Sequence, residues 1–182
     1  SSFDDYLNLP KKLSGSFELA IGSSSTPVEM LEEAGWKVVN PLVIARTPKN
    51  FQQYLQQSKG EFSVAKQGYV ISKSGWFSER SVSYLACGKP VVVQHTGFSD
   101  FIETGKGLFC FSSVEDIMRA LEVINGNYVK HCQWAREMVE EYFGNKVKYA
   151  VQEEQLGTGH AVMMAEGILK DKTENIIICY GD

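Results

Sequence analysis

The sequence lacks long hydrophobic runs, paired cysteines and metal-binding histidine motifs. No apolar stretch reaches the roughly 18 residues that a membrane-spanning helix needs, so no membrane span is predicted. The four cysteines form no CxxC pair and the three histidines form no HExxH motif, which argues against a zinc site. Residues 1–5 show no secretory signal, and scattered cysteines are typical of buried thiols in a reducing compartment. We therefore predict a cytoplasmic protein.

An excess of basic residues is also missing. Lys and Arg together number 18 against 22 for Asp and Glu, which gives a net charge of −4. Nucleic acids are held mainly by basic faces, so we expect no nucleic-acid partner. A small phosphate ligand needs only a local site and stays compatible with this charge. The length of 182 residues, 43% of them hydrophobic, suffices for one domain or for one domain and a fragment.

Short apolar runs alternate along the chain with amphipathic stretches. The runs predict strands at residues 17–21, 36–39, 90–94, 108–111, 147–151 and 175–180. Helices are predicted at residues 26–34, 48–57, 78–87, 113–124, 127–143 and 158–169. Thr26 is expected to cap the first of these helices in a capping box. Strands that alternate with helices predict an α/β fold, a Rossmann-like and mostly parallel sheet with helices on both faces.

Ligands in parallel sheets bind beyond the carboxyl ends of the strands, and three places along the chain are candidates for such a site. Ser78, Arg80 and Ser81 begin a helix, where free N–H groups attract phosphate and a guanidinium binds it with two hydrogen bonds. An ordinary capped helix with a surface arginine explains the same residues. Thr96 and Gly97 follow a buried strand, where they either offer backbone N–H groups to a ligand or simply form a turn.

Three further features are less specific. Gly157 and Gly159 precede the last predicted helix, as in a phosphate-binding loop, or merely permit a tight turn. Glu61 and Lys66 place a carboxylate and an ammonium five residues apart, either as a functional pair or as two solvated charges. Trp76 is expected in the core rather than in a stacking surface.

Residues from about 17 to 143 resemble the C-terminal, nucleotide-sugar-binding half of a GT-B glycosyltransferase. The resemblance rests on four stretches: GWKVVNP (35–41), GEFSVAKQGYV (60–70), SGWFSERSVSYL (74–85) and ACGKPVVVQHTG (86–97). It implies the transfer of a sugar from a nucleoside diphosphate sugar to an acceptor, with no cofactor required.

The same resemblance implies roles for single residues. Four side chains would neutralise the diphosphate leaving group: Ser78, Arg80, Ser81 and Lys66. Thr96 and Gly97 would line the sugar or phosphate, and Glu61 would act as the catalytic acid/base or contact the sugar. Ser83 stands where the commoner retaining enzymes have the glutamate that holds the donor ribose, so that contact is not carried over.

Residues from about 147 to 182 resemble a different family, the bacterial N-acetylglucosamine-1-phosphate uridyltransferases. The resemblance rests on VQEEQLGTGHAV (151–162) and YGD (180–182). The uracil contacts that it implies are Gln152, Gly157 and Thr158. Asp182 would bind Mg²⁺, a hard cation that carboxylates suit.

Together these features predict two parts, a nucleotide-sugar-binding domain at residues 1–145 and a strand–helix–strand fragment at 146–182 packed on the same sheet. Neither resemblance is complete, since the acceptor domain and the arginine-containing pyrophosphate loop of the two families are not found. We therefore expect a chimera with weak or no turnover. Three hypotheses stay open: an incomplete glycosyltransferase, a uridylyltransferase fragment using UTP and Mg²⁺, and a folded hybrid without activity. An exposed sheet edge would favour a homodimer.

Overall fold

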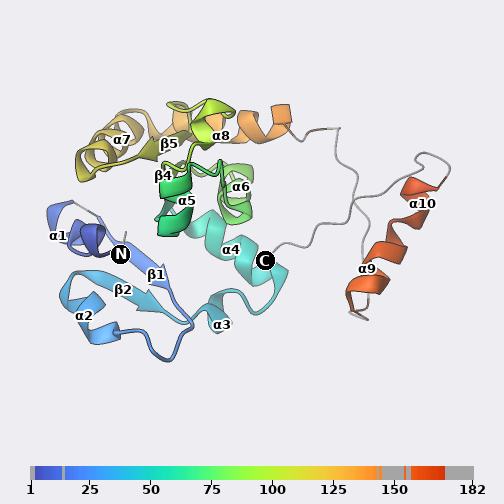
Figure 1. Cartoon of the computed structure of the whole chain (residues 1–182), viewed down its shortest axis with the longest axis horizontal. Helices are drawn as coiled ribbons and strands as arrows, with labels where there is room; N and C mark the ends of the chain where they lie inside the picture. Colours follow the sequence, from blue (N-terminus) through green and yellow to red (C-terminus); the bar gives the residue numbers. More distant parts are fainter. Residues whose placement is uncertain (1–2, 14, 143, 145–153, 155–156, 171–182) are drawn as a thin grey trace. The chain divides into compact units, whose positions relative to one another are not determined.

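The computed structural model describes residues 3–13, 15–142, 144, 154 and 157–170. The chain forms two compact units, Ser1–Val139 and Glu140–Asp182. The first unit holds parallel strands with helices around them, which confirms the predicted α/β class (Figure 1). The expected packing of the second part on the same sheet stays a prediction.

The described strands divide between two parallel sheets rather than joining one. In the first sheet, β1 (Phe17–Ala20) pairs with β2 (Trp36–Val39). In the second, β4 (Val91–Gln94) lies between β3 (Glu61–Ser63) and β5 (Leu108–Phe111). The two sheets contact each other through aromatic side chains. The rings of Trp36 in β2 and Phe62 in β3 stack with their centroids 6.1 Å apart.

The helices agree with most of the predicted ranges. Up to residue 142 they are α1 (Leu9–Lys12), α2 (Val28–Glu33), α3 (Pro41–Ile44), α4 (Pro48–Gln57), α5 (Gln67–Ser72), α6 (Glu79–Ala86), α7 (Val114–Gly126) and α8 (Tyr128–Tyr142). Short 3₁₀ turns occur at Asp4–Tyr6 and Phe98–Asp100. The predicted helix at 158–169 is realised as α9 (Thr158–Met164) and α10 (Glu166–Leu169). In the part of the chain that the structure describes, no helix is long and apolar enough to cross a membrane. The strands predicted at 147–151 and 175–180 lie outside the described residues.

The helix caps follow the sequence at two places and differ from it at a third. Thr47 caps α4 by accepting a hydrogen bond from the backbone N–H of Asn50. Ser113 and Asp116 form a complete capping box at α7. The predicted cap by Thr26 is wrong, because Pro27 occupies the N-cap position of α2 and no side-chain hydrogen bond caps this described helix.

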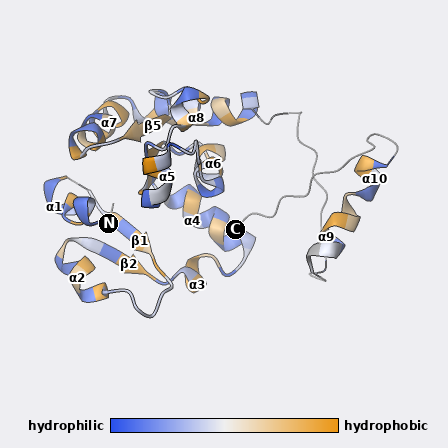
Figure 2. Ribbon diagram, viewed as in Figure 1, coloured by the Kyte–Doolittle hydropathy of each residue, from blue (hydrophilic) through white to orange (hydrophobic). Residues whose placement is uncertain are grey.

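The core lies on both faces of β4. Val92 belongs to one buried cluster, together with Trp36 and Phe111, whereas Val91 and Val93 belong to another. Such double burial is typical of a central strand in a parallel sheet. Helices supply much of the remaining apolar surface, and α4 and α7 show hydrophilic and hydrophobic colours side by side (Figure 2). The two clusters therefore meet across a single strand.

Gly107, the residue before β5, packs directly against the backbone of α8. Its φ is +76°, and a Cβ built there would lie 2.5 Å from the backbone N of Ala135 and 2.7 Å from its Cα. Its N–H donates to Nδ1 of His131 at 3.3 Å. Burial lowers the pKa of His131, which keeps the imidazole neutral and able to accept this bond. Only glycine fits this contact.

We expect Gly107→Ala to destabilise the protein more than Gly105→Ala. Both glycines have positive φ, at +76° and +98°, a conformation that costs an L-residue about 1–2 kcal/mol. A Cβ at position 105 would meet nothing within 4 Å. The clash with Ala135 should therefore add about 1–3 kcal/mol at position 107 alone. The free energy of unfolding in urea measures the difference, and equal losses would show that α8 moves to make room.

Candidate functional site

A small hollow opens at the carboxyl ends of β3 and β4, where α6 begins. Nine residues line it: Ser63, Ala65, Trp76, Phe77, Ser78, Ser81, Val93, Gln94 and Phe98. Ligands in open parallel sheets bind at this edge, beyond the carboxyl ends of the strands. The volume of the hollow is about 10 Å³, room for roughly one water molecule.

Two serines at the start of α6 face this hollow. Ser78 is the N-cap residue, and its Oγ accepts a hydrogen bond from the backbone N–H of Arg80 at 3.2 Å. Ser81 is fully buried, and its Oγ has no hydrogen-bond partner among the described residues. A buried hydroxyl left without a partner is uncommon in folded proteins. The Ser81 hydroxyl lies in the wall of the hollow, where a group the size of a water molecule could accept its hydrogen bond.

Arg80 is held in place by two side chains of β3. Its Nε donates to Oε1 of Glu61 at 2.7 Å, and its Nη2 donates to Oγ of Ser63 at 2.8 Å. The side chain of Arg80 is 51% exposed, whereas that of Glu61 is only 4% exposed. The buried carboxylate thus holds one edge of the guanidinium, and about half of the Arg80 side chain is open to solvent.

Glu61 pairs with Arg80 and not with Lys66. The second carboxylate oxygen, Oε2, is buried without a hydrogen-bond partner in the described part of the chain. Lys66 is exposed, and its Nζ lies 5.9 Å from the ring centroid of Tyr69. The cation beside Glu61 is therefore not Lys66 but Arg80, which lies 19 residues away along the chain.

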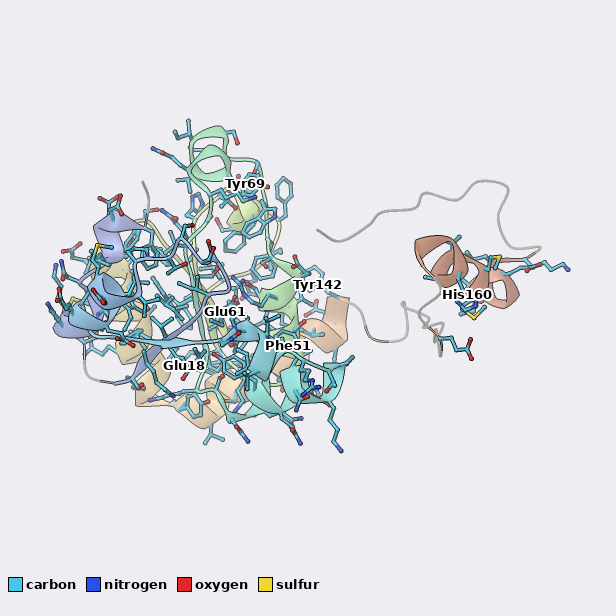
Figure 3. All side chains as sticks on the ribbon, turned by 90° about the horizontal axis from the view of Figure 1, so that it is seen from below. Glu18, Phe51, Glu61, Tyr69, Tyr142 and His160 are labelled. Atoms are coloured by element: carbon cyan, nitrogen blue, oxygen red, sulfur yellow. The ribbon has the colours of Figure 1, made fainter. Side chains whose placement is uncertain are left out.

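Tyr84 interacts electrostatically with the buried Glu61 and with Tyr54 and Glu18. Burial raises the pKa of Tyr84, and the negative charge of Glu61 adds to this effect. Burial also raises the pKa of Tyr54, which shares a hydrogen bond with Glu18. Lys37 donates to Glu18 at 2.7 Å and lowers the pKa of that carboxyl. Figure 3 shows Glu18 and Glu61 within the first unit. The raised pKa values keep the phenols of Tyr54 and Tyr84 protonated at neutral pH.

Thr96 and Gly97 hold the connection between α5 and α6. Thr96 is fully buried, and its hydroxyl donates to the carbonyl oxygen of Trp76 at 2.5 Å. The N–H of Gly75 donates to the carbonyl oxygen of Thr96 at 2.8 Å. Gly97 has φ +96°, and a Cβ there would lie 2.9 Å from the carbonyl oxygen of Lys73. The Thr96 hydroxyl is thus bonded to the backbone of Trp76. Thr96 and Gly97 therefore hold Trp76, which lines the hollow, rather than lining it themselves.

The candidate residues of the second unit are described only in part. Gly157 is the N-cap of α9 with φ +94°, as the tight-turn alternative requires, and Thr158 is the first residue of that helix. Gln152 and Asp182 lie outside the described residues. Within the described ranges, no group of three or more His, Cys, Asp or Glu side chains is placed to hold a metal ion.

The structure adds Ser63, Gln94 and Trp76 to the predicted site. Ser63 shares a face of β3 with Glu61, as residues two apart on a strand do, and this spacing was the available signal. The Oε1 of Gln94 accepts from the N–H of Ala65 at 3.1 Å. Trp76, expected in the core, lies at the hollow and is 36% exposed.

Comparisons with known proteins give short matches to the bifunctional protein GlmU. The chain is 51% identical over 51 residues to that of Symbiobacterium thermophilum, which covers 27% of this chain and 11% of the relative. It is 56% identical over 46 residues to that of Acetivibrio thermocellus, or 25% of this chain and 10% of the relative. It is 74% identical over 34 residues to that of Caldanaerobacter subterraneus, or 19% and 7%. The chain thus spans about a tenth of the length of these relatives.

These matches confirm a short stretch of similarity to N-acetylglucosamine-1-phosphate uridyltransferases. The comparisons lend no support to a GT-B half or to a chimera. No family model and no solved structure matches the chain. A nucleotide-related fragment is therefore what the similarity supports, and the glycosyltransferase interpretation stays a prediction.

We expect Arg80→Ala to destabilise the protein by about 2–3 kcal/mol, because it leaves the buried Glu61 carboxylate without its cation. This loss is below that of a fully buried pair, since water screens the half-exposed guanidinium. Adding Glu61→Gln should restore part of the stability by removing the buried charge. A urea double-mutant cycle measures both effects. Arg119→Ala, which breaks a more exposed pair with Asp116, is the control, and an equal loss there would contradict the prediction.

Proposed function

We propose that the surface at the start of α6, beside the hollow, binds the diphosphate of a nucleoside diphosphate sugar, as the donor-binding part of a glycosyltransferase. The observation that carries this proposal is the buried Ser81 hydroxyl, which has no partner among the described residues and lines the hollow at the first turn of α6. The positive end of the helix dipole and the free N–H groups favour an anion there. A water molecule in the hollow would link the buried Ser81 hydroxyl to a phosphate oxygen.

Arg80 supplies the positive charge. Glu61 and Ser63 fix its guanidinium before any ligand arrives, so little conformational entropy is lost on binding. A guanidinium also matches phosphate oxygens with two parallel hydrogen bonds. In a transfer reaction this charge would stabilise the diphosphate as it leaves. Glu61, being buried and paired, serves here as a positioning residue, and its role as an acid/base stays a prediction.

The remaining predicted contacts take more distant places in this proposal. Lys66 is exposed at the N-cap of α5 and would add a second cation near the ligand. Thr96 and Gly97 would act by fixing Trp76 and its loop, since the Thr96 hydroxyl donates to the Trp76 carbonyl. The sugar and the acceptor are left to residues that this geometry does not identify.

We expect UDP to stabilise the protein whether or not Mg²⁺ is present. At 100 times its dissociation constant, a ligand of the native state adds about 2.7 kcal/mol, which a thermal shift detects. Because Arg80→Ala alone destabilises the fold, the double variant Glu61→Gln/Arg80→Ala is the better test, and it should lose the shift. Arg119→Ala should retain it. No shift with millimolar UDP, or the same shift in the double variant, would overturn the proposed site.

A uridylyltransferase activity is the second candidate, and the similarity to GlmU favours it. In that case Gln152, Gly157 and Thr158 would contact uracil, and Asp182 would hold Mg²⁺. Magnesium bound there would neutralise charge on the UTP phosphates. The matches cover only 7–15% of the relatives' length, so their whole activity is a proposal for this chain.

For this second candidate we expect pyrophosphate to be released from UTP and N-acetylglucosamine 1-phosphate only when Mg²⁺ is present. Asp182→Asn should abolish the release, because the amide removes the anionic metal ligand. Glu61→Gln/Arg80→Ala should leave it unchanged, which separates the two candidates. A cooperative melt with neither a ligand shift nor pyrophosphate release would favour the folded hybrid without activity.

A further inference from the structure

A stacked pair of aromatic rings, Trp76 partly exposed and Tyr69 half-buried, lies beside the hollow. Tyr69 of α5 and Trp76 of the following loop stack with centroids 5.1 Å apart and planes inclined by 22°. Figure 3 shows Tyr69 toward the outer end of the first unit. Trp76 lines the hollow and is 36% exposed, so this Tyr69–Trp76 stack adjoins both the hollow and solvent.

The backbone of Trp76 is held firmly. Its carbonyl accepts from the buried Thr96 hydroxyl, and Gly75 donates to the carbonyl of Thr96. Lys73, with φ +47°, ends α5 in the left-handed conformation and lies against Gly97. These contacts fix the loop before a ligand binds, which reduces the entropy that binding must overcome.

The other tryptophans occupy different surroundings. Trp36 is 3% exposed and packs between Phe17 and Phe62 in the core. Trp134 lies against His131 on α8. Trp76 alone among the three lines the hollow that contains the unpartnered Ser81 hydroxyl. A large, partly exposed ring next to a polar anchoring group is therefore confined to this place among the described residues.

From this arrangement we infer that the Tyr69–Trp76 stack binds the base of the ligand whose phosphates lie at Ser81 and Arg80. The inference rests on the proposed nucleoside diphosphate site and assigns its base-binding surface. Bases stack on aromatic side chains through their flat faces, and every base offers such a face. The stack should therefore favour nucleoside diphosphates over pyrophosphate while distinguishing poorly between UDP and GDP.

Calorimetric titrations of the full chain with UDP, GDP and pyrophosphate test the inference. We expect Trp76→Leu to weaken UDP and GDP by about tenfold, within the range for loss of one stacked base, and to leave pyrophosphate unchanged. Trp76→Phe should keep most of the affinity. Tyr69→Leu should give a smaller loss, and it tests the same stack if the Trp76 variant does not fold. Trp134→Leu is the matched control and should bind all three ligands normally, and circular dichroism confirms that each variant folds.

Other outcomes separate the inference from the proposed function. Equal affinities for UDP and pyrophosphate in the unaltered chain would overturn the stacking role and leave the phosphate site standing. Equal losses for UDP and pyrophosphate in Trp76→Leu would show that Trp76 only supports the phosphate site. Dependence of N-acetylglucosamine 1-phosphate binding, and not of UDP binding, on Trp76 would assign the stack to a sugar. Binding of neither UDP nor pyrophosphate would overturn the site and the stack together.

Discussion

Burial of β4 on both faces is the constraint on which the first unit depends. Val92 points into one cluster and Val91 and Val93 into the other, so the strand sets the position of both clusters at once. At its carboxyl end, Gln94 accepts from the backbone of Ala65, and this bond ties the chain after β3 to the strand. The hollow is therefore built at the end of a strand whose residues are all buried.

The register between β3 and β4 places charge where the sheet would otherwise be apolar. Glu61 pairs with Val91 and Ser63 with Val93, so both polar side chains lie on the face that meets α6. A slip of one residue would exchange them for Phe62 and remove both partners of the guanidinium. A buried carboxylate is costly unless it is paired, so Arg80 belongs to the stability of the fold as well as to the site.

Local pattern predicted the regular elements well and the polar contacts poorly. The strands at 36–39 and 108–111 have the predicted bounds, since apolar β-branched and aromatic runs carry a strong signal. The strand β3 was not predicted, because two of its three residues are polar and its alternation spans too few positions. Glu61 and Arg80 lie 19 residues apart and meet only when β3 and α6 have packed together. No local sequence pattern therefore predicts their pairing. The exposure of Trp76 depends in the same way on its loop.

Binding a diphosphate and catalysing its transfer make different demands on a site of this kind. One fixed guanidinium, buried serine hydroxyls and a helix N-terminus can hold a diphosphate, but charge stabilisation accelerates a reaction only where water is excluded and the attacking group is positioned. Arg80 is half exposed, so solvent weakens its field in the structure as described. A base stacked on Trp76 would cover part of this opening. Under the proposed function, a base that excludes water from Arg80 would strengthen the interaction between the guanidinium and the phosphates as well as add affinity.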